Sequence, residues 1–315
     1  MPTLSGRWAA LLVSLTACGS LRPALTGPEA GGPSWRELTT PHFLLRTDLG
    51  SEQAKRIITE LERIEQVFID LSPGMPVPDR TRVLVFARQY DYDAVAPRES
   101  TGFFARDPRQ PGSPLIVLYG SLNDRTRRVL QHELTHRFIA EQIKKPPVWL
   151  NEGLASYFET MTFHDGKLEA GIADWQFSPG PYPPRVEPVP IEDLLRAGDK
   201  EFYGPREWEY SLTSWAFVHM LRASRPGYSE RFAKYVKSLR DGVGAQAAWQ
   251  AAFGDVSIRD LQVSFSNYIT SPFLTAISVP YDPPAPPVPE VRILTDEEVE
   301  EFLEWLRDAS KASER

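Results

Sequence analysis

Two periodicities in the apolar positions of this chain predict where helices and strands form. Residues 51–71 carry apolar side chains three or four positions apart, which is the spacing of one helix face. Short apolar-rich runs at 43–47, 81–86 and 115–119 are typical of strands. The same patterns predict a short strand at 101–105, helices at 124–143, 149–161, 207–224 and 229–238, and two helices within 243–272.

Proline-rich and polar stretches divide the chain into segments. Residues 162–206 are polar and rich in proline, which predicts a loop, and PYDPPAPPVPE at 280–290 predicts a stiff, extended linker. The helix that follows has one apolar face, which we expect to dock on the domain rather than wait for a partner. The expected segments are a signal peptide at 1–17, a flexible tether at 18–34, one domain at 35–275, a Pro-rich linker at 276–292 and a C-terminal helix at 293–315.

Length and charge narrow the classes of partner. A chain of 315 residues has room for one large domain or two modest ones with a substantial core. Its 42% apolar and 24% charged residues are ordinary for a soluble globular protein. Because the formal charge is −7 and no basic stripe occurs, nucleic acid is not an expected partner.

The start of the chain predicts a lipid anchor. Residues 9–15 form an apolar run that suits a signal peptide and is too short to span a bilayer. The string LTACG at 15–19 follows and resembles a bacterial lipobox, which implies cleavage before Cys18, the only cysteine, and acylation of its thiol and amine. The resemblance implies a lipid-anchored protein of the cell envelope, sorted to the outer membrane and facing the periplasm or the cell surface. An ordinary secretory signal, or a buried helix with an inert thiol, are the alternatives.

The string HELTH at 132–136 supplies the candidate chemistry. Histidines four residues apart project from one face of a helix, so both imidazoles can reach one metal ion. Glu133 lies beside the first ligand and cannot easily join the same coordination shell, but its carboxylate can face a zinc-bound water, whose pKa is about 7. The motif therefore predicts that His132 and His136 hold a metal and that Glu133 is the base. A surface helix that merely contains two histidines is the alternative.

A catalytic zinc takes three protein ligands, so a third is expected from another element. The string PVWLNEGLA at 147–155, a short gap after HELTH, resembles the gluzincin metallopeptidases and is most similar to the bacterial peptidase MA-like families. The resemblance implies that Glu152 is the third ligand, that Gly153 allows close helix packing, and that one Zn²⁺ is bound per chain. A solvent-exposed glutamate at a helix start is the alternative for Glu152, and other first-row metals also suit two imidazoles and a carboxylate.

The same resemblance implies a fold and further roles. It implies an α+β, thermolysin-like catalytic domain with a twisted, mainly antiparallel sheet packed on helices, and a helical second half. The strand at 115–119 resembles the edge strand that binds an extended peptide, and Tyr210 resembles a tyrosine that stabilises the oxyanion, although a core tyrosine is equally consistent. One departure is Ser156, which occupies the position of an aspartate that orients a zinc histidine. Glu159 could serve instead, but we expect a solvent-facing carboxylate there.

These features together predict a zinc metallopeptidase, most consistent with an endopeptidase, that hydrolyses peptide bonds through a zinc-bound water activated by Glu133. Its expected partners are a peptide or protein substrate and, through the anchor, a lipid bilayer. Two alternatives stay open: a zinc-binding structural or interaction lipoprotein with little turnover, and a metal-dependent hydrolase of non-peptide amides or esters.

Overall fold

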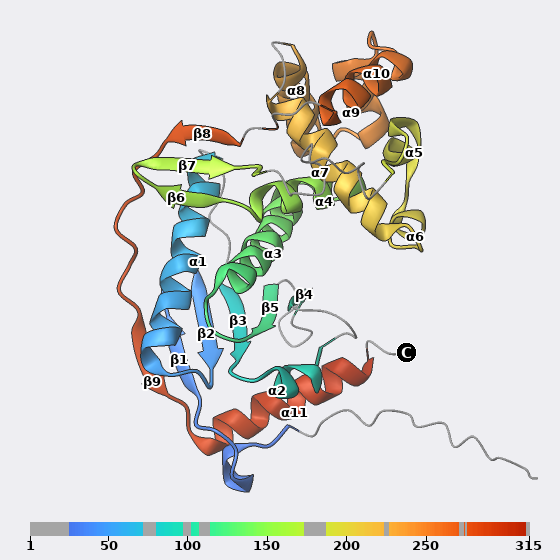
Figure 1. Ribbon diagram of the computed structural model, residues 1–315. Helices are drawn as coiled ribbons and strands as arrows, with labels where there is room; N and C mark the ends of the chain where they lie inside the picture. Colours follow the sequence, from blue (N-terminus) through green and yellow to red (C-terminus); the bar gives the residue numbers. More distant parts are fainter. Residues whose placement is uncertain are drawn as a thin grey trace, which may run out of the picture.

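The protein is an α+β structure in which a sheet with helices on both faces adjoins a helical half (Figure 1). The computed structural model describes residues 25–71, 80–96, 102–106, 114–172, 187–223, 227–270, 274 and 276–312. The predicted signal peptide and Cys18 therefore lie outside the described residues. Within them, no helix combines the length and apolar character needed to cross a bilayer.

The main sheet is mixed. Its strands lie in the order β4 (Gly102–Arg106), β5 (Pro114–Tyr119), β3 (Thr81–Phe86), β2 (Phe43–Thr47), β1 (Arg36–Thr39) and β9 (Glu290–Ile293). The pairings β2–β3 and β3–β5 are parallel, and the other three are antiparallel. The prediction that β5 is an edge strand is wrong, because β4 pairs along its outer side and forms the edge among the described strands.

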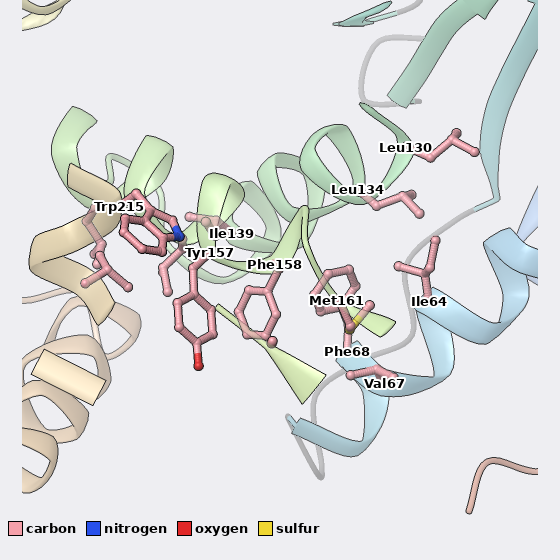
Figure 2. Packing of buried hydrophobic residues seen from close by; sticks show 14 of the residues in the cluster. Ile64, Val67, Phe68, Leu130, Leu134, Ile139, Tyr157, Phe158, Met161 and Trp215 are labelled. Atoms are coloured by element: carbon pink, nitrogen blue, oxygen red, sulfur yellow. The ribbon is translucent and has the colours of Figure 1, made fainter. Parts of the chain in front are cut away.

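Alternate residues of the central strands enter two separate cores, which is why these strands appear as nearly continuous apolar runs. In β3, Val83 and Val85 contribute to the core beneath α1 (Ser51–Leu71) and α3 (Asp124–Gln142), whereas Leu84 and Phe86 contribute to the core on the other face. That second core is closed by α2 (Gln89–Asp93) and α11 (Asp296–Ala312). Figure 2 shows side chains of α1 and α3 within the first core, where Phe68 meets Phe158 edge to face at 5.7 Å.

The helical half begins at α4 (Val148–Phe158), which packs closely against α7 (Glu207–Ala223). The helices α8 (Tyr228–Arg240), α9 (Ala245–Phe253) and α10 (Ile258–Ile269) complete it. The predicted loop at 162–206 is wrong in its described parts, because they contain β6 (Thr162–His164), β7 (Lys167–Ala170), α5 (Ile191–Arg196) and α6 (Asp199–Phe202). These elements are too short to produce a recognisable period, and the prolines of this stretch, which all lie outside the four elements, favour the interpretation as a loop.

The C-terminal segment runs back along the molecule and joins both sheets. β8 (Ile277–Pro280) pairs with β7, and β9 pairs with β1, so strands interrupt the predicted linker at 276–292. The expected docking of the last helix is confirmed, because Val299, Phe302 and Leu303 of α11 are buried. The predicted tether is shorter than expected, since Leu25 is buried in the same core and the short 3-10 helix η1 (Pro28–Ala30) contacts α11.

Candidate metal centre

Helix α3 presents the two histidines of the motif on its solvent-accessible side. Asn123 caps the helix by accepting a hydrogen bond from the Thr126 N–H at 3.0 Å. Leu130 and Leu134 are fully buried on the core side. His132 and His136 are therefore fixed in one register, with their rings 4.7 Å apart and nearly perpendicular.

Helix α4 brings the third residue to the same point. A Cβ on Gly153 would lie 2.7 Å from the Ser214 carbonyl oxygen of α7, so only glycine permits this approach of the two helices. The predicted role of Gly153 in close helix packing is thus confirmed. The packing holds Glu152 opposite α3, with its side chain 11% exposed.

Three side chains from the two helices converge. The Nε2 atoms of His132 and His136 lie 3.0 Å apart. The Glu152 carboxylate lies 3.6 Å from each of these atoms, through Oε2 and Oε1 respectively. Within the described part of the chain, this is the one group of His, Cys, Asp or Glu side chains close enough to hold a metal ion. The structure thus brings together all three predicted ligands.

Glu159, the residue directly after α4, orients His132. Its Oε2 lies 3.1 Å from His132 Nδ1, and its Oε1 accepts a hydrogen bond from Arg128 at 2.5 Å. With Nδ1 engaged, the Nε2 atom of His132 is directed toward His136 and Glu152. The expectation of a solvent-facing Glu159 is therefore wrong. The Glu159 carboxylate contacts His132 in the way that was expected of an aspartate at the position of Ser156.

Tyr203, immediately after α6, is a further member of the site. Its hydroxyl donates a hydrogen bond of 2.6 Å to Glu152 Oε1. Tyr210, the fourth residue of α7, is half-buried, with its ring 5.4 Å from that of Phe202. Tyr210 does not line the cavities beside the metal centre, and its catalytic role stays a prediction.

The three side chains fit a tetrahedral zinc site in donor type and spacing. Two imidazole nitrogens at about 2.0–2.1 Å from a zinc ion lie roughly 3.3 Å apart, close to the 3.0 Å observed here. No protein-family model matches the chain, and no curated protein matches it either. The interpretation of the centre therefore depends on its own geometry and chemistry.

Negative charge around His132 favours a cation at the centre. Burial lowers the pKa of His132, but its contacts with Glu152 and Glu159 and the charge of Glu133 outweigh burial and raise that pKa to about 10. Burial lowers the pKa of His136, which keeps its Nε2 lone pair available. Without a metal, a proton on His132 therefore neutralises part of the negative charge of the surrounding carboxylates. A divalent cation at the centre would neutralise that charge more completely.

Carboxylates at the centre have different pKa shifts that suit different roles. Burial is the largest effect on Glu133 and raises its pKa, which favours a group that accepts a proton. For Glu152, burial also acts upward, but His132, His136 and Tyr203 together lower the pKa below its ordinary value. Glu152 therefore stays ionised as a ligand must. Burial and the neighbouring Glu152 charge raise the pKa of Tyr203, so its hydroxyl stays protonated.

Two cavities meet at the centre. The first, of about 790 Å³, lies between α4 and the start of α7 and is lined by His132, Glu152, Trp208, Leu212 and Trp215 among others. The second, of about 560 Å³, lies between α3 and β4 and is lined by His132 and Glu133. Arg128, His132 and Glu159 line both, so the two cavities form one cleft beside the three ligands, of which His132 and Glu152 line the cleft and His136 does not.

Sequence reasoning missed Arg128, Tyr203 and Trp208. Arg128 lies four residues before His132 on the same helix, and this spacing alone could have identified it as a neighbour. Tyr203 and Trp208 reach the cleft through the packing of α6 and α7, which has no local sequence signal.

Proposed function

We propose that the protein is a zinc-dependent metallopeptidase, and more narrowly an endopeptidase. The observation that carries the proposal is the convergence of His132, His136 and Glu152 beside a cleft that His132, Glu152 and Glu133 line. A zinc ion held by these three ligands would act as a Lewis acid and lower the pKa of a water to about 7. The remaining chemistry belongs to the side chains of this chain.

Glu133 is the proposed general base and acid. Its carboxylate accepts a proton from the attacking water and delivers it to the leaving amine nitrogen, and its raised pKa suits both transfers. Glu159 holds His132 in the orientation that directs Nε2 to the centre. Tyr210 is the proposed donor of a hydrogen bond to the developing oxyanion, since the hydroxyl of Tyr203 already donates to Glu152.

An extended peptide is the substrate that the cleft suits best. β4, which forms the edge of the sheet among the described strands, borders the cavity that contains Glu133, since Gly102 of β4 lines it. A strand-like substrate adding to β4 would pass across the metal centre into the cavity lined by Trp208 and Trp215. A cleft that continues to both sides of the centre accommodates residues before and after the cleaved bond, as an endopeptidase requires.

The proposal is tested by metal content and hydrolysis measured on the same variants. After zinc addition and dialysis, we expect about one zinc per wild-type chain and little in His136→Ala and Glu152→Ala at retained fold. Glu133→Gln should keep zinc but lose hydrolysis of unfolded protein or casein by about 10²–10⁴-fold. Glu230→Gln, an exposed carboxylate on α8, serves as the matched control. A wild type that binds no zinc contradicts the proposal. A wild type that binds zinc but hydrolyses none of the substrates favours a zinc-binding lipoprotein, and one that cleaves only small esters favours a hydrolase of another class.

We also propose that the chain is lipid-anchored at the bacterial envelope through Cys18, on the strength of the lipobox resemblance. Expressed with its full N-terminus, the wild type should partition into the detergent phase, whereas Cys18→Ser should be released to the aqueous phase because acyl chains supply the membrane affinity. Equal partitioning of both proteins would contradict the anchor.

A further inference from the structure

A separate cavity of about 530 Å³ lies in the helical half. It is bordered by the starts of α4 and α10 and by α5, α8 and α9. None of its lining residues also lines the cleft at the metal centre. The cavity is therefore a distinct candidate binding site that the proposed peptidase chemistry does not use.

Aromatic rings form the inner surface of this cavity. Trp149 and Tyr235 lie parallel with their centroids 6.0 Å apart, and Trp249 meets Tyr235 edge to face at 5.3 Å. Trp249 is partly exposed, and one of its faces stacks on Phe253 at 4.4 Å. A rigid aromatic surface backed by packed rings is thus available to a ligand with an apolar face.

Polar groups surround the aromatic surface and carry no net charge. Glu192 and Arg196 of α5 pair with each other at 2.7 Å, so their charges cancel. Gln246 and Gln250 of α9 are exposed, and their side-chain amides make no hydrogen bond with other described residues. Each amide offers both a donor and an acceptor. The rim therefore suits a neutral ligand with many hydroxyl groups and does not suit an anion such as phosphate.

Tyr235 adds a hydroxyl to the lining of this cavity. Only 1% of the residue is exposed, and its hydroxyl makes no hydrogen bond with any described residue. Burial alone raises the pKa of Tyr235, so the hydroxyl stays protonated. Its oxygen is not among the fully enclosed polar atoms that lack a partner, so it reaches the surface of the cavity, where it can donate a hydrogen bond to a ligand.

We propose that this cavity binds a neutral saccharide. A pyranose ring has one face of C–H groups, which can stack on the indole of Trp249, and equatorial hydroxyls that can pair with Gln246, Gln250 and the hydroxyl of Tyr235. The cavity volume accommodates a short oligosaccharide segment. The site acts as a binding site beside the metal cleft, and no bond of the saccharide is broken there.

The test is a titration of the full chain with triacetylchitotriose and, separately, with maltotriose, followed by intrinsic tryptophan fluorescence. We expect a saturable change with at least one probe, with a dissociation constant in the range of about 10 μM to 1 mM. Trp249→Ala should weaken binding by more than about tenfold because it removes the stacking surface. Trp208→Ala, which removes a tryptophan of the other cleft, should bind the probe as the wild type does.

Two further variants keep the proposal falsifiable if Trp249→Ala fails to fold. Tyr235→Phe removes only the hydroxyl, and Gln250→Ala changes only an exposed side chain, so both should fold and both should weaken binding several-fold. Absence of saturation with both saccharides at about 10 mM overturns the proposal. Wild-type affinity in Tyr235→Phe and Gln250→Ala together overturns it as well. We expect these substitutions to leave the zinc content unchanged, because none of them lies in the metal cleft. Failure of saccharide binding is therefore distinguishable from failure of the peptidase proposal.

Discussion

At the residue scale, Glu159 links the metal centre to the wall of the cleft, since its two oxygens contact His132 and Arg128. Loss of a carboxylate behind a metal-ligating histidine typically weakens metal binding by about 10–100-fold. We therefore predict that Glu159→Gln binds zinc about 10–100-fold more weakly, measured by competition with a chelator. Ser156→Ala, on the same helix and in the same cleft, is the control and should bind zinc normally. Equal affinities in the two variants would show that Glu159 does not orient His132.

Tyr203 and Tyr210 differ in what they touch, and this difference separates their roles. A hydrogen bond to a charged group is worth about 1.5–3 kcal/mol, so Tyr203→Phe should weaken zinc binding by about tenfold or more through Glu152. Tyr210→Phe should leave zinc affinity unchanged. If Tyr210 donates to the oxyanion, its variant lowers kcat by about 10²–10³-fold at full zinc occupancy. An unchanged kcat in Tyr210→Phe would end the prediction made for it from sequence.

The residues of the centre were predictable to the extent that their geometry is local. The spacing of His132 and His136 follows from the pitch of one helix, and Glu152 followed from a motif with a short gap. The contact of Tyr203 with Glu152 depends on how α6 packs against α4, and the contact of Glu159 with His132 depends on the rotation of α4 relative to α3. Both depend on tertiary packing, which is why the sequence predicts a solvent-facing Glu159.

At the element scale, a partly buried ion pair joins the residue before β2 to α1. His42 Nδ1 lies 2.7 Å from Glu62 Oε2, and the His42 backbone N–H donates to Glu62 Oε1 at 3.1 Å. The hydrogen bond with Glu62 is the main cause of the raised pKa of His42. Burial raises the pKa of Glu62, but its hydrogen bonds outweigh burial and lower that pKa. Glu65 and Arg137 face the pair and act on His42 in opposite directions.

This pair predicts a pH dependence of folding stability. A raised histidine pKa contributes stability that is fully present below about pH 6.5 and is lost as pH rises through the folded pKa. The lowered Glu62 pKa contributes stability above about pH 4.5, which is lost as pH falls. The difference in free energy of unfolding between wild type and His42→Asn should therefore be largest near about pH 6 and smaller at about pH 9. Urea unfolding measures it, and a difference independent of pH would contradict the ion pair.

The elements themselves were predicted best where burial is periodic over many residues. The bounds of α1, β2 and β3 agree with the sequence prediction, because their apolar residues enter well-defined cores. β1, β8 and β9 were not predicted, since each has four residues and β9 is exposed along its whole length. Their formation depends on distant partner strands. The edge position of β4 likewise follows from pairing that the composition of β5 does not encode.

At the scale of the whole molecule, the metal cleft lies where the two halves meet. α3 belongs to the sheet-containing half and α4 begins the helical half, yet both supply ligands. The close packing of α4 on α7 extends into the cleft, because Leu212 and Trp215 of α7 line it. A change in how the helical half packs would therefore alter the distance between Glu152 and the two histidines.

The pairing of β1 with β9 has a consequence for how a newly made chain acquires this structure. Arg292 of β9 donates to Glu37 of β1 across 255 residues of sequence. At a synthesis rate of roughly 5–20 residues per second, β1 is made about 10–50 s before β9. During that interval the outer edge of β1 and the apolar side chain of Trp35 lack the cover that β9 and α11 later provide. The nascent chain therefore exposes this edge to chaperones before the sheet is complete.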